Sequence, residues 1–374
     1  MTAAVAPRRR RRRLDASLIV GIALIAVIVI GAVLLALNGR NFFSAGNIRD
    51  ILTGMSVLGF VAIGQTLVIL CASLDLSVPY VVSLSSLIAA DMMAGNPANI
   101  LPAVATVLVV AAGIGLVNGL IVAGLKVNGF IATLGSGLII KGYLDSNYKG
   151  TSGQVPWEFQ LIGATGVGPI PVSTLIMLFV AVLVALFLNR TRTGNRFFAV
   201  GGNQQVARLS GIRTGRSLVL AHVLCSVTAA FAGLLLASRL GVGSPTVGTQ
   251  CGYDLLSIAA VVLGGTLLLG GRGSVWGTIG GVAIFAVLDN VMSVLQVNPF
   301  LKDVVRGIVI VAAVAVYTSR VTERRRARFG PGGAGSQAPP GGLAVAVAGV
   351  PASGADAASG ADDGPHETGT EQAR

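Results

Sequence analysis

The sequence predicts an all-α fold, a polytopic transmembrane helical bundle of about ten spans. Three observations support this prediction: 53% of the 374 residues are hydrophobic, only 11% are charged, and long stretches contain no charged residue. A soluble domain carries about 25% charged residues, so this composition cannot supply an ordinary water-facing surface. Helices need about 20 apolar residues to cross a bilayer, whereas membrane β-barrels use short alternating segments, which are not found here.

The predicted spans follow one another along the chain. Five runs without Asp, Glu, Lys or Arg are long enough to cross the hydrocarbon core: 16–39, 51–74, 92–125, 159–189 and 217–238. Five shorter apolar runs complete the set: 77–94, 127–142, 255–270, 274–296 and 303–318. We therefore expect a membrane domain over residues 16–320.

The formal net charge of +12 is unevenly distributed. If the arginine run at 8–13 lies in the cytoplasm and the chain crosses ten times, 20 of the 27 Lys and Arg residues fall on the cytoplasmic side. An excess of this kind is typical of cytoplasmic loops. We predict that both termini are cytoplasmic and that the basic segment 1–15 contacts anionic lipid. Aromatic residues make up only 5% of the chain, which argues against a nucleic-acid partner.

Residues 321–374 differ from the rest of the chain. They begin with several arginines, and the stretch 331–374 is rich in Ala, Gly, Pro and Ser, with five acidic residues and no amphipathic period. Such a composition cannot bury enough apolar surface to fold, so we predict a disordered cytoplasmic tail.

The motifs of soluble enzymes are missing from the sequence. No lysine follows a glycine, so the chain has no phosphate-binding loop of the G-x-x-x-x-G-K-[ST] type. Its two histidines, His222 and His366, belong to no recognisable catalytic set, and the three cysteines lack metal-site spacing. We expect a chain that is not an enzyme and binds no cofactor or metal, so any ATP hydrolysis takes place on another polypeptide.

The longest cytoplasmic loop in this arrangement runs over residues 189–216. Asn203 can cap a short helix over Gln204–Leu209, and Gly211 would end it. A capped helix in this loop suits a docking element for a soluble partner. The six arginines of the loop are equally well explained by a basic loop that only fixes topology.

Four stretches stand out, in this order: GQTLVILCASLDLSV (64–78), NGFIATLGSGLIIKG (128–142), RTGNRFFAVGGNQQVARLSGI (192–212) and LLSIAAVVLGGTLLLGGRGSVWGTIGGVAIFAVLDN (255–290). Together they resemble the ribose/xylose-type sugar permeases of ATP-binding cassette (ABC) importers. The resemblance covers roughly residues 40–320 and excludes both ends. Two departures bear on substrate details: Pro79 stands where the family usually has glycine, and Asp254 where it usually has Glu.

The resemblance implies a permease subunit in a bacterial cell membrane, which forms the path of a pentose or hexose. Its implied partners are a cytoplasmic ATPase that holds ATP and Mg, an extracytoplasmic sugar-binding protein and a second, identical permease subunit. The loop motif of the family contacts the ATPase. The implied coupling residues are Gly201, Gly202, Asn203, Ala207, Arg208, Leu209, Ser210, Gly211 and Ile212.

Several alternatives to a sugar permease stay open at this point. A related ABC permease could carry a nucleoside, a branched-chain amino acid or a furanose-like signal. A secondary transporter could show similar hydropathy, but it would need no ATPase-docking loop. A membrane scaffold without a transport role is disfavoured by the polar residues inside the spans.

Further candidate residues each have two interpretations. Asp75 and Ser77 either cap the helix that follows, with Pro79 in its first turn, or place Asp75 near the gate or the ATPase interface. We favour the cap because Asp and Ser at a helix start satisfy N–H groups that the helix leaves unpaired. Asn118, Asn128 and Asn290 either line the substrate path or bond between helices. His222 is interpreted as a packed, hydrogen-bonded residue, because no acid recurs on its helical face.

Glycines at four-residue spacing are typical of close helix contacts. Gly273, Gly277 and Gly281 form one such series, and Gly115 and Gly119 form another. We expect packing within one subunit, with a dimer contact as the alternative.

Overall fold

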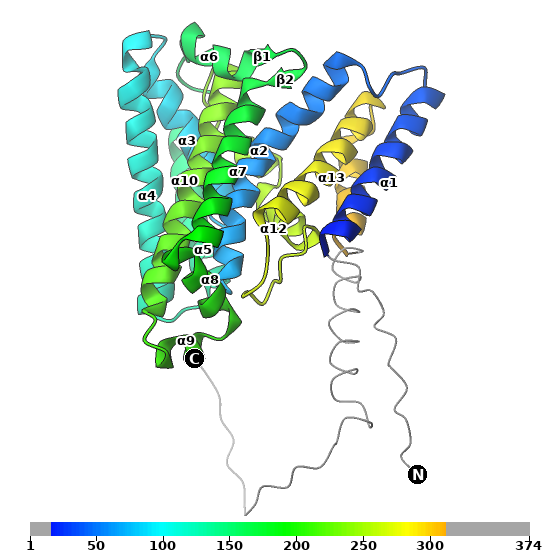
Figure 1. The fold of residues 1–374 in the computed structure, drawn as a ribbon. Helices are drawn as coiled ribbons and strands as arrows, with labels where there is room; N and C mark the ends of the chain where they lie inside the picture. The colour runs from blue at the N-terminus through cyan, green and yellow to red at the C-terminus, as the bar shows by residue number, and fades with distance from the viewer. Residues whose placement is uncertain (1–15, 312–374) are drawn as a thin grey trace, which may run out of the picture. The chain divides into compact units, whose positions relative to one another are not determined.

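The computed structural model describes residues 16–311. The predicted N-terminal segment 1–15, the end of the predicted span 303–318 and the tail 321–374 lie outside this range. The helices are α1 (Ala16–Leu37), α2 (Ala45–Leu70), α3 (Val78–Met93), a 3-10 turn (Pro97–Asn99), α4 (Ile100–Gly124), α5 (Gly129–Asn147), α6 (Trp157–Ala164), α7 (Val172–Arg190), α8 (Arg192–Gly202), α9 (Gln204–Leu209), α10 (Thr214–Leu240), α11 (Val247–Gln250), α12 (Tyr253–Leu263), α13 (Val275–Val294) and a final helical segment over 299–311 (Figure 1).

Six of these helices are long and apolar enough to cross a membrane. They are α1, α2, α4 with its preceding 3-10 turn, α7, α10 and α13, while α3 and α12 are shorter apolar helices. The only sheet among the described residues is a two-stranded hairpin of β1 (Gly166–Val167) and β2 (Ile170–Pro171), in which Val167 pairs with Ile170. The all-α prediction is thus confirmed for the described part of the chain.

Two predicted spans differ from the observed helices. The uncharged run 159–189 is divided into α6, the hairpin and α7, because the Gly and Pro residues of 166–171 break the helix there. The run 255–270 holds only the 11-residue helix α12, followed by an irregular connection over 264–274. In that connection Gly265 and Gly270 adopt φ of +89° and +83°, a backbone conformation that favours glycine.

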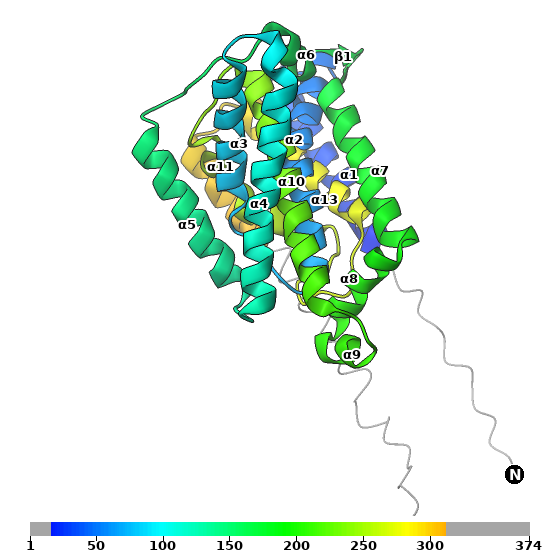
Figure 2. The same ribbon diagram turned by 90° about the vertical axis from the view of Figure 1, so that its left-hand side faces the viewer.

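α2 and α10 form the centre of the bundle. In the most apolar part of each helix, 83% and 67% of the residues are buried. The two helices pack against each other, α10 also packs against α3 and α4, and α2 packs against α13 (Figures 1 and 2). α1 packs on α13, where Leu35 and Phe42 meet Val287. Peripheral helices expose large apolar side chains, such as Leu101 on α4 and Ile139 on α5, as expected of a surface that faces lipid.

Glycines allow the closest contacts between helices. A Cβ at Gly115 or Gly119 of α4 would lie 2.6 Å from the backbone of α10. A Cβ at Gly277 or Gly281 of α13 would lie 2.1 Å from a carbonyl oxygen of Gly264 or Ala260. Gly273, predicted in the same helical series, instead precedes α13 and faces the side chain of Thr266, so the stripe on α13 contains two of its three glycines.

Candidate functional site

The connection between α7 and α10 forms two short helices at the end of the bundle where α2 ends. Figure 2 shows α9 beyond α8 and below the ends of α7 and α10. The side chain of Asn203 accepts the N–H groups of Gln205 and Val206 at 2.9 and 3.0 Å, and Gly211 follows with φ of +80°. The predicted capped helix over Gln204–Leu209 is therefore confirmed.

α9 carries an exposed apolar edge. The side chains of Val206 and Leu209 are 57% and 89% exposed, while Ala207 is buried against the bundle. Arg208 is also exposed. An apolar edge next to a cation is what a helix needs to bind a groove on another protein, because buried aliphatic contacts give affinity and charge directs the encounter.

α8 rests directly on the interior of the bundle. Its side chains Phe197 and Val200 are buried. A Cβ at Gly201 would lie 1.8 Å from the carbonyl oxygen of Leu70, the last residue of α2. That same oxygen accepts the N–H of Gly271 at 3.0 Å, which satisfies a carbonyl that the helix end leaves unpaired. Movement of α8 must therefore displace the end of α2 and the connection 264–274 together.

A buried polar network surrounds the connection between α2 and α3. The Oδ1 of Asp75 accepts the N–H of Ser77 at 3.0 Å and its hydroxyl at 2.5 Å. The Oδ2 of Asp75 lies 3.1 Å from Nδ1 of His222 on α10, and Nε2 of His222 lies 3.1 Å from Oγ of Ser73. Asp75 and His222 are fully buried.

This polar network compensates for irregular backbone inside the bundle. The connection 71–77 is not helical, so its N–H groups need partners from other elements. Leu76 donates its N–H to Thr133 of α5 at 2.9 Å, and Asn118 of α4 donates to the hydroxyl of Ser77 at 2.9 Å. Non-helical backbone at membrane depth is tolerated where protein buries it in this way.

The network shows where Asp75, Ser77 and His222 lie. Asp75 accepts the N–H of the residue before α3, and Pro79 occupies the first turn of that helix. The side chain of Ser77 caps nothing and donates to Asp75 instead. The acid that pairs with His222 comes from a different segment, so a search along α10 alone does not find it.

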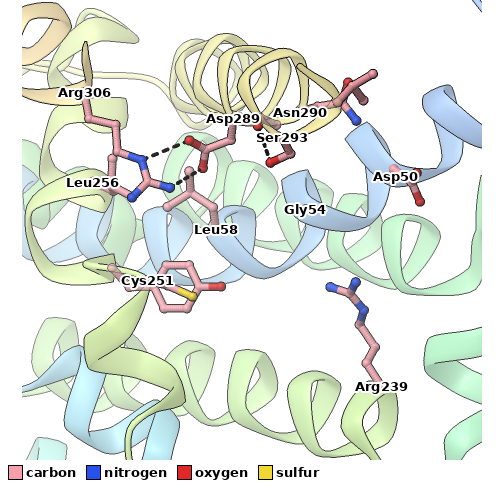
Figure 3. A pocket seen from close by; sticks show the side chains of 13 residues that line it. Asp50, Gly54, Leu58, Arg239, Cys251, Leu256, Asp289, Asn290, Ser293 and Arg306 are labelled. Atoms are coloured by element: carbon pink, nitrogen blue, oxygen red, sulfur yellow. Dashed lines mark hydrogen bonds and ion pairs between the residues drawn. The ribbon is translucent and has the colours of Figure 1, made fainter. Parts of the chain in front are cut away.

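A polar pocket of about 440 Å³ lies at the opposite end of α10 (Figure 3). We call it the polar pocket because polar side chains line it: Asp50, Arg239, Asp289, Asn290, Ser293 and Arg306. They come from the start of α2, the end of α10, the end of α13 and the segment 299–311, while Leu58, Leu256 and Ala286 supply apolar walls.

Arg306 fixes the carboxylate of Asp289. Its Nε and Nη2 donate to the two carboxylate oxygens at 2.9 Å each, and its Nη1 donates to Asp303 at 3.0 Å. A bidentate pair of this kind is geometrically specific and stronger than a neutral hydrogen bond. The Oδ1 of Asn290 is buried and accepts no hydrogen bond from any residue within 16–311.

The three asparagines predicted for a substrate path do not come together. Asn290 lines the polar pocket, Asn118 belongs to the buried network, and Asn128 caps α5 by accepting the N–H of Phe130. Asp50, Arg239 and Arg306 belong to no motif of the sequence and were not predicted as site residues. The one feature of the sequence that could have indicated them is their position, since each of these charged residues lies just outside or within an apolar run.

Comparison with known proteins assigns the chain to a protein family. The family described as "Branched-chain amino acid transport system / permease component" matches residues 47–314. The chain belongs to this permease family. Its resemblance to sugar permeases is confirmed at the level of the family. With its apolar helices, the permease is a multi-pass membrane protein.

Three relatives of this permease are bacterial import proteins. The ribose import permease protein RbsC of Escherichia coli (strain K12) is 39% identical over 78% of this chain and 92% of its own length. RbsC of Bacillus subtilis (strain 168) is 36% identical over 75% of this chain and 88% of its own length. The galactose/methyl galactoside import permease protein MglC of Escherichia coli (strain K12) is 33% identical over 80% of this chain and 95% of its own length. No solved structure matches the permease.

Proposed function

We propose that the chain is the permease subunit of an ATP-driven importer and forms the path of a monosaccharide, a pentose or a hexose. The observation that carries this proposal is the 39% identity to a ribose import permease, which covers nearly the whole of that relative. The permease works with a cytoplasmic ATPase, which binds ATP and Mg, and with an extracytoplasmic binding protein that delivers the sugar. A second copy of the chain completes the membrane part.

The proposed topology has ten passes and cytoplasmic termini, in the inner membrane of a bacterium. The six long apolar helices supply six passes, and α3, α5, α12 and the segment that begins at 299 supply the others. Connection 189–216, with α8 and α9, then faces the cytoplasm, and its arginines agree with the excess of basic residues on that side. The polar pocket faces the opposite, extracytoplasmic side.

The coupling element in this proposal is α9 with its flanking residues, Gly201–Ile212. Closure of the ATPase pushes on the exposed edge of α9, and α8 passes the displacement to the end of α2 and to the connection 264–274. The chain itself performs no chemistry on the sugar.

Charge reversal on α9 tests the coupling. Arg208→Glu should lower sugar uptake at least tenfold in vesicles that hold the complete importer, while the protein stays in the membrane. The matched control is Arg216→Glu, which makes the same charge change at an exposed site of the same end outside α9. Uptake by Arg208→Glu at the rate of the control would rule out the coupling assignment.

The energy source separates the importer from a secondary transporter. Uptake of ribose or galactose should continue when a protonophore collapses the proton gradient, as long as ATP is present, and it should require the binding protein. Uptake that stops with the gradient while ATP remains would favour the secondary transporter.

A further inference from the structure

The polar pocket has features of a ligand site that transport by alternating access does not require. We propose that it is a recognition site within the permease for a neutral, polyhydroxylated ligand, namely the monosaccharide released by the binding protein. The inference rests on the proposed function and adds a binding step in the membrane subunit itself.

Hydrogen-bond capacity is the first argument. Asn290 offers a buried Oδ1 with no partner among the described residues. The side chains of Arg239 and Asp50 form no ion pair and no hydrogen bond with any residue within 16–311. In Figure 3 the guanidinium group of Arg239 extends from α10 into the space across from Asp50 and Asp289. The pocket therefore holds both donors and acceptors that a bound molecule could satisfy.

The charges of the pocket define the ligand class. Two carboxylates and two guanidinium groups line the pocket, so their formal charges cancel. A hydroxyl group both donates and accepts, and a row of hydroxyls can bond to carboxylates, amide and guanidinium at once. A strongly charged ligand would meet a repelling group on one side. The aliphatic side chain of a branched-chain amino acid would leave the buried Oδ1 of Asn290 without a donor, which costs affinity.

The preorganised geometry supports recognition rather than a simple channel. Arg306 holds Asp289 by two hydrogen bonds, and Ser293 donates to the backbone oxygen of Asp289 at 2.7 Å while it accepts from Lys302 at 2.9 Å. These bonds fix the acceptor before a ligand arrives, and a preorganised acceptor loses less entropy on binding. Leu58 and Leu256 provide apolar surface for the C–H groups of a sugar ring.

Size and position agree with this assignment. Small-molecule sites occupy about 300–1,000 Å³, and the pocket of about 440 Å³ lies in the lower part of that range. Arg239 lies 23 residues after Arg216 on one helix, which at 1.5 Å per residue places it about 35 Å from the end that carries α9. In the proposed topology this is the side from which the binding protein delivers its cargo.

Direct binding to the importer tests the proposal. The permease–ATPase complex in lipid nanodiscs, without binding protein, is titrated with D-ribose, D-galactose and L-leucine, and bound ligand is followed by saturation-transfer NMR. One of the two sugars should bind saturably. Arg239→Gln and Asp50→Asn should each weaken that binding about tenfold, as expected for loss of a charge-assisted hydrogen bond. Arg40→Gln, an exposed arginine between α1 and α2 that does not line the pocket, is the control and should bind like the wild type.

A second measurement tests the role of the pocket separately from the proposed importer function. Arg239→Gln and Asp50→Asn should each co-purify with the ATPase as an intact complex, which shows that both variants fold and assemble, while their sugar uptake falls. Unchanged sugar binding and uptake in both variants would overturn the pocket assignment and leave the importer function intact. Preferential binding of leucine would overturn the ligand class. Uptake that stops with the proton gradient while ATP remains would instead refute the proposed function, and the binding titration would still decide the role of the pocket.

Discussion

Two adjacent glycines of α8 allow a sharp test of how that helix is seated. A Cβ at Gly201 would lie 1.8 Å from the carbonyl oxygen of Leu70 and 2.5 Å from the N of Gly271, whereas a Cβ at Gly202 meets nothing within 4 Å. Ordinary contact begins at 3.4 Å, so Gly201→Ala must open the contact by about 1.6 Å. Overpacking costs about 1–3 kcal/mol, and loss of the hydrogen bond from Gly271 to Leu70 adds about 1 kcal/mol.

Gly201→Ala should therefore destabilise the protein by about 2–4 kcal/mol. Gly202→Ala should be neutral or slightly stabilising, because alanine is favoured over glycine in a helix by about 1 kcal/mol. Unfolding of the two purified variants in mixed detergent micelles, followed by circular dichroism, measures the difference. Equal stability of the two variants would refute the proposed seating of α8 on the end of α2.

Two further predictions concern other parts of the chain. His222→Phe should lower the free energy of unfolding by about 3 kcal/mol, because it removes a partner from the buried carboxyl group of Asp75. Adding Asp75→Asn to this variant should recover part of that loss. Strictly additive effects of the two substitutions in the same unfolding assay would contradict a direct interaction. Outside the spans, burial and the hydrogen bond to Asp91 raise the pKa of Tyr148 from 10.0 to about 12. Folding thus favours the protonated phenol, so its stabilising contribution is complete below pH 10 and is lost as the pH rises through about 12. An ultraviolet titration should show this tyrosine ionising late, and ionisation near pH 10 in the folded protein would contradict the contact with Asp91.

Much of the fold could be predicted because hydropathy reports directly on burial in lipid. α1, α4 and α10 correspond closely to uncharged runs of the sequence. Hydropathy alone could not show that 159–189 contains a hairpin, since the residues of that turn are uncharged as well. The Gly and Pro residues of 166–171 carried that information and had to be weighed against the length of the run.

The candidate site was predictable only where its signal was local. The capped helix α9 depends on neighbouring residues, from Asn203 to Gly211, and was found. The polar pocket joins Asp50, Arg239, Asp289 and Arg306, which lie on α2, α10, α13 and the segment 299–311 and meet only when these elements are folded together. No periodicity within one helix connects them.

The pairing of Asp75 with His222 has a consequence for synthesis of the protein. The two residues are 147 positions apart, and chains grow at about 5–20 residues per second, so Asp75 is synthesised about 7–30 s before His222. During that interval α2 and α3 carry an acid without its histidine, and burial of that acid in lipid would be costly. Water or the insertion machinery must shield the acid until α10 is inserted. Chains truncated before His222 should accordingly be captured by membrane proteases, whereas chains that end just after α10 should escape them.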